Sequence, residues 1–348
     1  MEQEISVRFP NIGSHITKIS KDADGYKIII RGIDLLCSQN GLITKTYEEA
    51  LFLLLYGEFP NKKELVDEQQ NLYEGFFAGK EIFLELTKSS LNFDYSPLTQ
   101  LQVLVLFLST NKKLNPFFIV GAAFSFVAQI INKYLKQEFD VKLDNNAGLI
   151  ENLIKTVGFS DIANKKQVKL FENMMIAWMD IGPSPSVISS ILNSSLETNI
   201  STSIASGIGA TSGLKHTSAR MKILKTLISL KKAMHENNLD CENREILNND
   251  LANQIVFNNF QNILDGKNLL YGFGHYFFKG PDIFIDPRIT IVQDAIIAQN
   301  KSIDLLNILS IAKNVCNSGL LRKNGKSLIL PINADGYWGV YLLTPPLK

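Results

Sequence analysis

Cysteine is scarce in this sequence of 348 residues, and neither sign of charge predominates. The three cysteines, Cys37, Cys241 and Cys316, are odd in number and far apart, which argues against a disulfide framework and a zinc site. We therefore expect reduced thiols, a cytoplasmic protein and no bound metal. Lys and Arg number 35 against 34 Asp and Glu, and this balance argues against a broad nucleic-acid-binding face.

Long apolar runs are also missing. The most apolar stretches are 101–108 and 116–131, and both fall short of the ~18 uninterrupted apolar residues that a membrane-spanning helix needs. We interpret both as buried core helices and expect no contact with a membrane. The first residues, Met-Glu-Gln-Glu, are acidic and precede no apolar run, so we expect no signal peptide.

Strand-like patterning is confined to the first 31 residues, where a β-branched run at 26–30 follows an Asp-Gly turn signal. Helical patterns dominate afterwards. A capping box, Thr-Tyr-Glu-Glu at 46–49, starts a helix that ends near Gly57. Further helices are predicted over 62–78, 97–110, 116–136, 166–180, 184–195, 199–211, 217–236, 245–264, 288–299 and 302–318. The sequence therefore predicts a mainly helical, all-α fold with minor β structure at the N-terminus.

Three short motifs each place one ionisable side chain beside glycine or another small residue. They are Gly-Leu-Lys-His at 213–216, Gly-Phe-Gly-His at 272–275 and Asn-Ala-Asp-Gly at 333–336. The two histidines and the aspartate are 59 and then 60 residues apart. Two imidazoles and one carboxylate suffice to move a proton from carbon to oxygen.

Each of these three residues also has a simpler interpretation. Asp335 could cap a helix N-terminus, since aspartate is a favoured cap. His275 could be a satisfied histidine in a glycine turn. His216, at the start of a predicted helix, could cap that helix, or it could act as a neutral imidazole that donates a hydrogen bond to an enolate oxygen.

Two neighbouring segments have the composition of a ligand site. Alternate glycines let a ligand approach the backbone of the loop formed by Tyr271, Gly272, Phe273 and Gly274. Lys279 follows this loop and could face a phosphate. Arg288, after an Asp-Pro turn, could grip a substrate carboxylate through two parallel hydrogen bonds or, equally, pair with a helix cap.

Together, these motifs resemble those of the citrate synthase family, and matching pieces occur in family order from about residue 13 to residue 343. The N-terminal pieces lie at 16–19, 26–32 and 46–60. The resemblance implies a helical homodimer. Each subunit would have a large domain, 1–221 completed by 329–348, and a smaller domain, 222–328, which closes over the ligands.

The resemblance also implies a Claisen-type condensation of acetyl-CoA, or a related acyl-CoA, with a 2-oxo acid or another carbonyl acceptor. CoA would be released, and no cofactor would be permanently bound. Asp335 would take a proton from the methyl carbon, His216 would stabilise the enolate, and His275 would protonate the acceptor oxygen.

The resemblance assigns binding roles as well. Arg288 would hold an acceptor carboxylate, with Asp180 and Ile181 nearby. The loop 271–274 would line the adenine site, and Lys279 and Lys326 would face a CoA phosphate.

Three departures from the family pattern concern the acceptor. Ile181 stands where the family usually has an oxaloacetate-binding histidine, although Asp180 is kept. The usual Gly-Gly after the first catalytic histidine is Thr-Ser at 217–218, and the sequence ends at Lys348, before the family's last carboxylate-binding arginines. Each lost charge-assisted contact forfeits roughly 1.5–3 kcal/mol. We therefore expect an acceptor less polar than oxaloacetate.

Two other functions stay open. The motifs at 180–183 and 333–336 are similar to Asp-His-Gly-Pro and Asn-Val-Asp-Gly of citryl-CoA lyase and ATP-citrate lyase, which would imply cleavage of a citryl-type thioester. A relative that binds CoA without turnover is the third possibility. The presence of both motif histidines and the aspartate argues against it.

Overall fold

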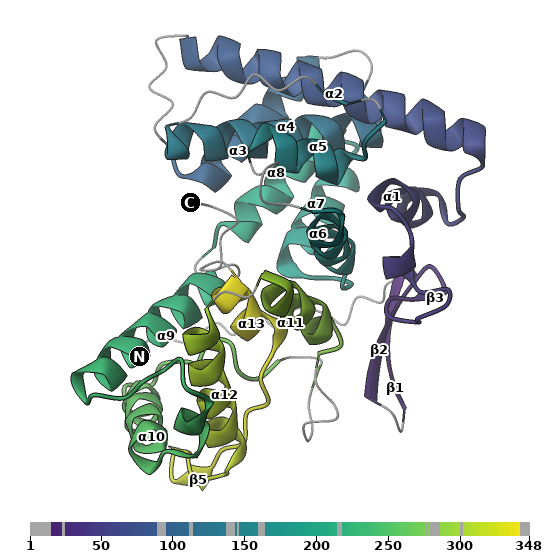
Figure 1. The fold of residues 1–348 in the computed structure, drawn as a ribbon. Coiled ribbons are helices and arrows are strands. Elements are labelled where there is room, and N and C mark those ends of the chain that lie inside the picture. Colours follow the sequence, from purple (N-terminus) through teal and green to yellow (C-terminus); the bar gives the residue numbers. More distant parts are fainter. Residues whose placement is uncertain are drawn as a thin grey trace, which may run out of the picture.

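The chain folds mainly into helices, as the sequence predicts, and the all-α class is confirmed (Figure 1). The computed structural model describes residues 15–22, 25–88, 95–110, 114–136, 143–144, 146–158, 164–213, 218–275, 278, 286–299 and 302–341. The α-helices are α1 (Tyr47–Tyr56), α2 (Lys62–Lys88), α3 (Pro97–Phe107), α4 (Pro116–Leu135), α5 (Leu149–Thr156), α6 (Lys165–Ala177), α7 (Pro185–Ser194), α8 (Ile200–Thr211), α9 (Ser218–Glu236), α10 (Asp250–Asp265), α11 (Arg288–Gln299), α12 (Ile303–Asn317) and α13 (Ala334–Tyr341). Short 3-10 helices are η1 (Leu42–Thr44), η2 (Leu108–Thr110) and η3 (Arg244–Asn248).

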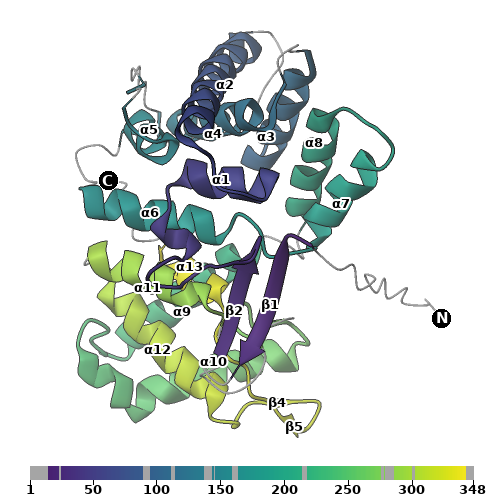
Figure 2. The same cartoon turned by 90° about the vertical axis from the view of Figure 1, so that its right-hand side faces the viewer.

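The strands form two small antiparallel sheets in the described part of the chain. The first contains β1 (Thr17–Asp22), β2 (Gly25–Ile30) and β3 (Ile33–Asp34), and the second contains β4 (Arg322–Lys323) and β5 (Lys326–Ser327). The β1–β2 hairpin runs in register from the pair Thr17 and Ile30 to the pair Asp22 and Gly25, which confirms the predicted N-terminal strands (Figure 2).

The capping box at the start of α1 is present. Glu49 N donates to Thr46 Oγ1 at 3.2 Å, and Thr46 N donates to Glu49 Oε2 at 2.8 Å. The neighbouring carboxylate, Glu48, is buried and accepts a hydrogen bond from Leu149 N at 2.7 Å, so α1 caps α5. The sequence pattern missed α5 because its N-cap, Gly148, has no side chain and the capping group comes from a distant helix.

Helices α2 and α4 approach so closely that their backbones touch. A Cβ on Gly75 would lie 2.0 Å from Phe118 O, and one on Gly121 would lie 2.0 Å from Leu72 O. By length and composition, α4 is the one described helix that could cross a membrane. However, half of its 18-residue apolar stretch is buried inside the protein. Phe117 of α4 is fully buried, as expected for a core helix.

Two groups of helices are stacked in Figures 1 and 2. Helices α1–α8 occupy the upper part, and α9, α10 and α12 occupy the lower part, with α11 and α13 between them. Helix α11 contacts α6 above and α13 beside it, and α13 contacts α9. The predicted domain boundary at 221–222 falls within the first turns of α9, and the division into two domains stays a prediction.

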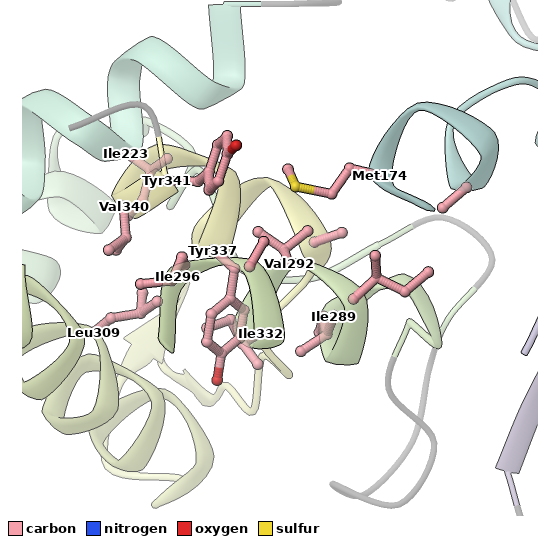
Figure 3. Close-up of a cluster of buried hydrophobic side chains, with 14 of the residues drawn as sticks. Met174, Ile223, Ile289, Val292, Ile296, Leu309, Ile332, Tyr337, Val340 and Tyr341 are labelled. Carbon is pink, nitrogen blue, oxygen red and sulfur yellow. The ribbon is translucent and has the colours of Figure 1, made fainter. Parts of the chain in front are cut away.

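A shared core fixes these central helices to one another. Figure 3 shows Met174 of α6, Ile223 of α9, Val292 of α11 and Val340 of α13 gathered in one buried cluster. Because all four contributing helices are locked by apolar packing, polar groups carried on their ends are held in fixed positions.

Candidate functional site

Two of the three motifs lie side by side. The segment 271–275 pairs with the segment that leads into α13 through an antiparallel bridge between Phe273 and Ile332. Gly274 N donates to the carbonyl oxygen of Pro331 at 2.7 Å, and Asn333 N donates to that of Gly272 at 3.0 Å. This pairing brings the loop of one motif against the helix start of the other.

The close approach depends on glycine at both motifs. Gly272 has a φ of +85°, and a Cβ there would lie 2.9 Å from Ile223 Cγ1 and 3.1 Å from Gly336 Cα. A Cβ on Gly336 would lie 3.0 Å from Gly272 O. A side chain at either position would push the loop away from α13.

Asn333, and not Asp335, caps α13. Asn333 Oδ1 accepts hydrogen bonds from Asp335 N at 3.0 Å and from Gly336 N at 3.3 Å. Its Nδ2 donates to Gly274 O at 2.6 Å, so one side chain joins the helix start to the glycine loop. The interpretation of Asp335 as a helix cap is therefore wrong, because asparagine at 333 already satisfies the exposed N–H groups.

The Asp335 carboxylate instead forms an ion pair with Arg220 of α9. Arg220 Nε donates to Asp335 Oδ1 at 2.9 Å, and each side chain is 34% exposed. Sequence reasoning missed Arg220, although it stands only four residues after His216. His216 and Lys279 lie outside the described residues, so their predicted roles stay predictions.

His275 is largely buried between charged neighbours. Burial lowers the pKa of His275, and Arg288 acts in the same direction, whereas Asp286 and Asp335 oppose the shift. Phe278 N donates to Nδ1 at 3.4 Å, and this contact favours the tautomer of the neutral imidazole that carries its proton on Nε2. Near neutral pH, the ring therefore presents an Nε2–H donor.

Arg288 is tied to Asp286. Its Nε and Nη2 donate to the two carboxylate oxygens at 2.9 and 2.6 Å, and its backbone N donates to Oδ1 at 3.0 Å. The side chains are 7% and 0% exposed, so this pair is desolvated. The alternative interpretation, an arginine paired with a helix cap, fits this contact, because Asp286 also accepts from the first backbone N–H of α11; the pair is buried and not on the surface. Contact of Arg288 with an acceptor carboxylate stays a prediction.

An aromatic pair links the two arginines. Trp178 and Trp338 meet edge to face with ring centroids 5.3 Å apart. The Arg288 guanidinium carbon lies 4.7 Å from the Trp178 centroid, and that of Arg220 lies 5.1 Å from the Trp338 centroid. Each distance is within the range of a cation–π contact. Two arginine–carboxylate pairs thus lie at opposite ends of one tryptophan pair.

Asp180 is held by the N-terminal sheet. Its Oδ2 accepts a hydrogen bond from Thr17 Oγ1, and its Oδ1 accepts one from Gly182 N at 3.1 Å. These contacts anchor the turn between α6 and α7 to β1. Ile181 packs, partly buried, against the main hydrophobic core. No described contact brings either residue against His275 or Asp335.

The described members of the predicted CoA-binding set lie on two segments, the loop 271–274 and the hairpin of β4 and β5. Tyr271 OH accepts a hydrogen bond from Lys222 Nζ at 2.8 Å, which places a lysine that the sequence did not single out at the glycine loop. Lys326 lies on the exposed hairpin of β4 and β5, which contacts α10. Among the described residues, no cluster of three or more His, Cys, Asp or Glu side chains could hold a metal ion.

The comparisons with known proteins point to one family. The family described as "Citrate synthase, C-terminal domain" matches residues 8–343. The sequence has no significant match among curated proteins.

Similar solved structures come from three organisms. Citrate synthase from Thermoplasma acidophilum, in a ternary complex with carboxymethyl coenzyme A and oxaloacetate, has 15% identity and a TM-score of 0.71 over 99% of this chain and 84% of that one. Citrate synthase from Pyrobaculum aerophilum has 17% identity and a TM-score of 0.68, over 96% of this chain and 81% of that one. Citrate synthase from Thermotoga maritima MSB8 has 18% identity and a TM-score of 0.70, over 99% of this chain and 86% of that one. At these identities, the structures establish the fold.

Proposed function

Because the chain belongs to the citrate synthase family, we propose that it is a condensing acyltransferase. In this reaction, acetyl-CoA or a related acyl-CoA is joined to the carbonyl carbon of a 2-oxo acid or another carbonyl acceptor, and CoA is released. Coenzyme A enters as part of a substrate, with no permanently bound cofactor. The ligand of the Thermoplasma acidophilum enzyme, carboxymethyl coenzyme A, is of the same kind.

The observation that carries this proposal is the pairing of two motifs that are 60 residues apart in the sequence. Hydrogen bonds from Asn333 join the loop that ends in His275 to the helix that carries Asp335. The electrostatic influence of Asp335 on the pKa of His275 reflects their proximity. A carboxylate base and a neutral imidazole donor thus lie on one rigid unit, as proton transfer from carbon to oxygen requires.

In the proposed mechanism, Asp335 accepts a proton from the carbon next to the thioester carbonyl. His216 donates a hydrogen bond to the enolate oxygen that forms. The enolate carbon then attacks the acceptor carbonyl, and the acceptor oxygen takes the proton from His275 Nε2. Water hydrolyses the thioester of the product and releases free CoA.

For the acceptor, we propose a molecule less polar than oxaloacetate. Ile181 cannot donate a hydrogen bond, and Arg288 already has two of its donor nitrogens on Asp286. Arg288 is therefore not available as a partner for the second carboxylate of a dicarboxylate, which disfavours such an acceptor.

We also propose a cytoplasmic homodimer that uses α7 and α8 as its contact, without nucleic-acid or membrane partners. No residue of α7 is buried in the subunit, and Ile191 and Leu192 are 50% and 62% exposed. In the following turn and helix, Leu196 and Ile200 are 71% and 40% exposed. Covering apolar surface of this extent favours association with a second copy.

Release of free thiol from acetyl-CoA, measured across a panel of 2-oxo acids, tests the proposed reaction. The wild type is compared with Asp335→Asn, which keeps the shape of the side chain but removes the base. Thiol release with one acceptor, lost in Asp335→Asn, supports condensation. No release with any acceptor would contradict it and favour cleavage of a citryl-type thioester or CoA binding without turnover. Ordinary citrate production from oxaloacetate would contradict the acceptor assignment alone.

A further inference from the structure

Arg220 and Arg288 differ in how completely their charge is neutralised. Arg288 is 7% exposed and faces Asp286 with a two-pronged salt bridge, so this pair has no net charge and little access to solvent. Arg220 is 34% exposed and donates to Asp335 from Nε alone. Its terminal nitrogens are the part of the fork that a carboxylate grips.

We infer that Arg220 is the cation that binds the acceptor carboxylate, and that this binding releases Asp335 to act as a base. The inference rests on the proposed function, which supplies the acceptor, but it assigns to the site a residue outside its three motifs. The ligand class is a 2-oxo acid with a single carboxylate.

The ion pair explains how the base is controlled. While Arg220 holds Asp335 Oδ1, this carboxylate oxygen is occupied by a charge-assisted hydrogen bond and is not directed at a substrate carbon. An incoming carboxylate competes for the same guanidinium. When it wins, Asp335 loses its partner and becomes available to the acyl thioester.

The Arg220 guanidinium lies over the ring of Trp338, one member of the tryptophan pair. The Arg220 guanidinium carbon lies 5.1 Å from the centroid of Trp338, so the cation can rotate over the ring face without losing this contact. Trp178 contacts Trp338 edge to face, and Arg288 lies over the Trp178 ring. Because Arg288 is committed to Asp286, it is not available to a second substrate carboxylate, which favours a monocarboxylate with an apolar side chain.

The first experiment measures binding of a 2-oxo acid, 2-oxobutyrate, and of the matching aldehyde, propanal, by titration calorimetry. Arg220→Gln is expected to weaken binding of the 2-oxo acid roughly ten- to hundredfold, the effect of one charge-assisted contact, and to leave the aldehyde unaffected. Arg220→Lys keeps the positive charge but lacks the planar guanidinium, so its affinity for the 2-oxo acid should lie between those of the wild type and Arg220→Gln. Lys225→Gln, an exposed residue of the same helix, removes the same charge as a matched control.

The second experiment measures exchange of the acetyl-CoA methyl protons with deuterium from the solvent, without acceptor. In the wild type, exchange should be slow and should rise when the 2-oxo acid is added. In Arg220→Gln, it should be raised severalfold in the absence of any acceptor, because Asp335 is already released. A Lys225→Gln enzyme should behave like the wild type.

The outcomes separate this inference from the proposed function. Equal loss of 2-oxo acid and aldehyde binding in Arg220→Gln, or no carboxylate-dependent binding by the wild type, overturns the inference. If methyl-proton exchange in a folded Arg220→Gln enzyme is unchanged or lower, the inference that Arg220 restrains Asp335 as a base is contradicted. Arginine-dependent binding of the 2-oxo acid without thiol release supports the inference and contradicts the proposed reaction.

Discussion

Trp178 and Trp338 stand edge to face at 5.3 Å, although 160 positions separate them in the sequence. Each supports an arginine that is paired with a carboxylate: Arg288 with Asp286, and Arg220 with Asp335. The turn after α6 and the helix α13 thus meet at one aromatic contact. Any ligand that moves Arg220 changes the surroundings of Trp338.

These are the only two tryptophans in the sequence, so tryptophan fluorescence, excited selectively over the ten tyrosines, reports on this site alone. We expect addition of a 2-oxo acid to change the emission intensity or wavelength in a saturable way. Trp338→Phe should lose most of the change, because its ring contacts Arg220 directly, whereas Trp178→Phe should retain most of it. A ligand response that is equal in the two variants would contradict this assignment.

The sequence predicted the helices and their caps well where the signals are local. The capping box of α1 and the N-terminal hairpin are examples, because adjacent residues satisfy each other's backbone groups. The sequence pattern missed α5, because the first backbone N–H group of this helix is capped by Glu48, about 100 residues earlier in the chain. Local patterns carry no information on such distant partners.

The candidate site shows the same limit. The motifs identified His275 and Asp335, but not the ion pair of Asp335 with Arg220 or the capping role of Asn333. Both depend on how α9 and the glycine loop pack against α13. A sequence shows which groups can ionise, whereas the fold decides which of them face one another.

The glycine contact between loop and helix is testable by comparing two glycines with the same backbone conformation. Gly272 and Gly57 have φ values of +85° and +87°, but only Gly272 has neighbours that a Cβ would strike. Gly57→Ala should cost about 1–2 kcal/mol for the left-handed conformation alone. Gly272→Ala should cost about 1–3 kcal/mol more, because the methyl group collides with Ile223 and Gly336. Denaturant unfolding of both variants measures the difference, and equal losses would contradict it.

The link provided by Asn333 predicts a separation of stability from activity. Asn333→Ala removes the cap of α13 and the bond to Gly274 O, so we expect a loss of about 1–2 kcal/mol and of most turnover. Asn333→Asp keeps an acceptor for the cap but no donor for Gly274. Its stability should stay closer to the wild type while turnover falls, as measured by unfolding and thiol release. Full activity in Asn333→Asp would show that the link to the glycine loop is dispensable.

The exposed apolar residues of α7 and the following turn predict the oligomeric state. Leu192→Asp and Leu196→Asp place a charge at positions that are 62% and 71% exposed in the subunit. Light scattering after gel filtration should give a dimer for the wild type and a monomer for the double variant. Leu269→Asp, at another exposed leucine, is a matched control that should leave the dimer intact. A monomeric wild type would contradict the proposed contact.

The buried imidazole predicts a pH dependence with a defined sign. Burial lowers the pKa of His275 in the folded state below its value of ~6.5 in an unfolded chain. The folded state then binds the proton more weakly than the unfolded state. The contribution of neutral His275 to stability is therefore present above pH ~6.5. It is lost as the pH falls through the lower pKa that His275 has in the folded state.

His275→Gln removes this titration and keeps an oxygen that can accept from Phe278 N. We expect the thermal midpoint of the wild type, relative to that of His275→Gln, to decrease between pH 7.5 and pH 5. Parallel curves for the two proteins would show that the imidazole is no harder to protonate in the fold than in the unfolded chain. In that case, neutral His275 would lose its physical basis as the Nε2–H donor of the condensation.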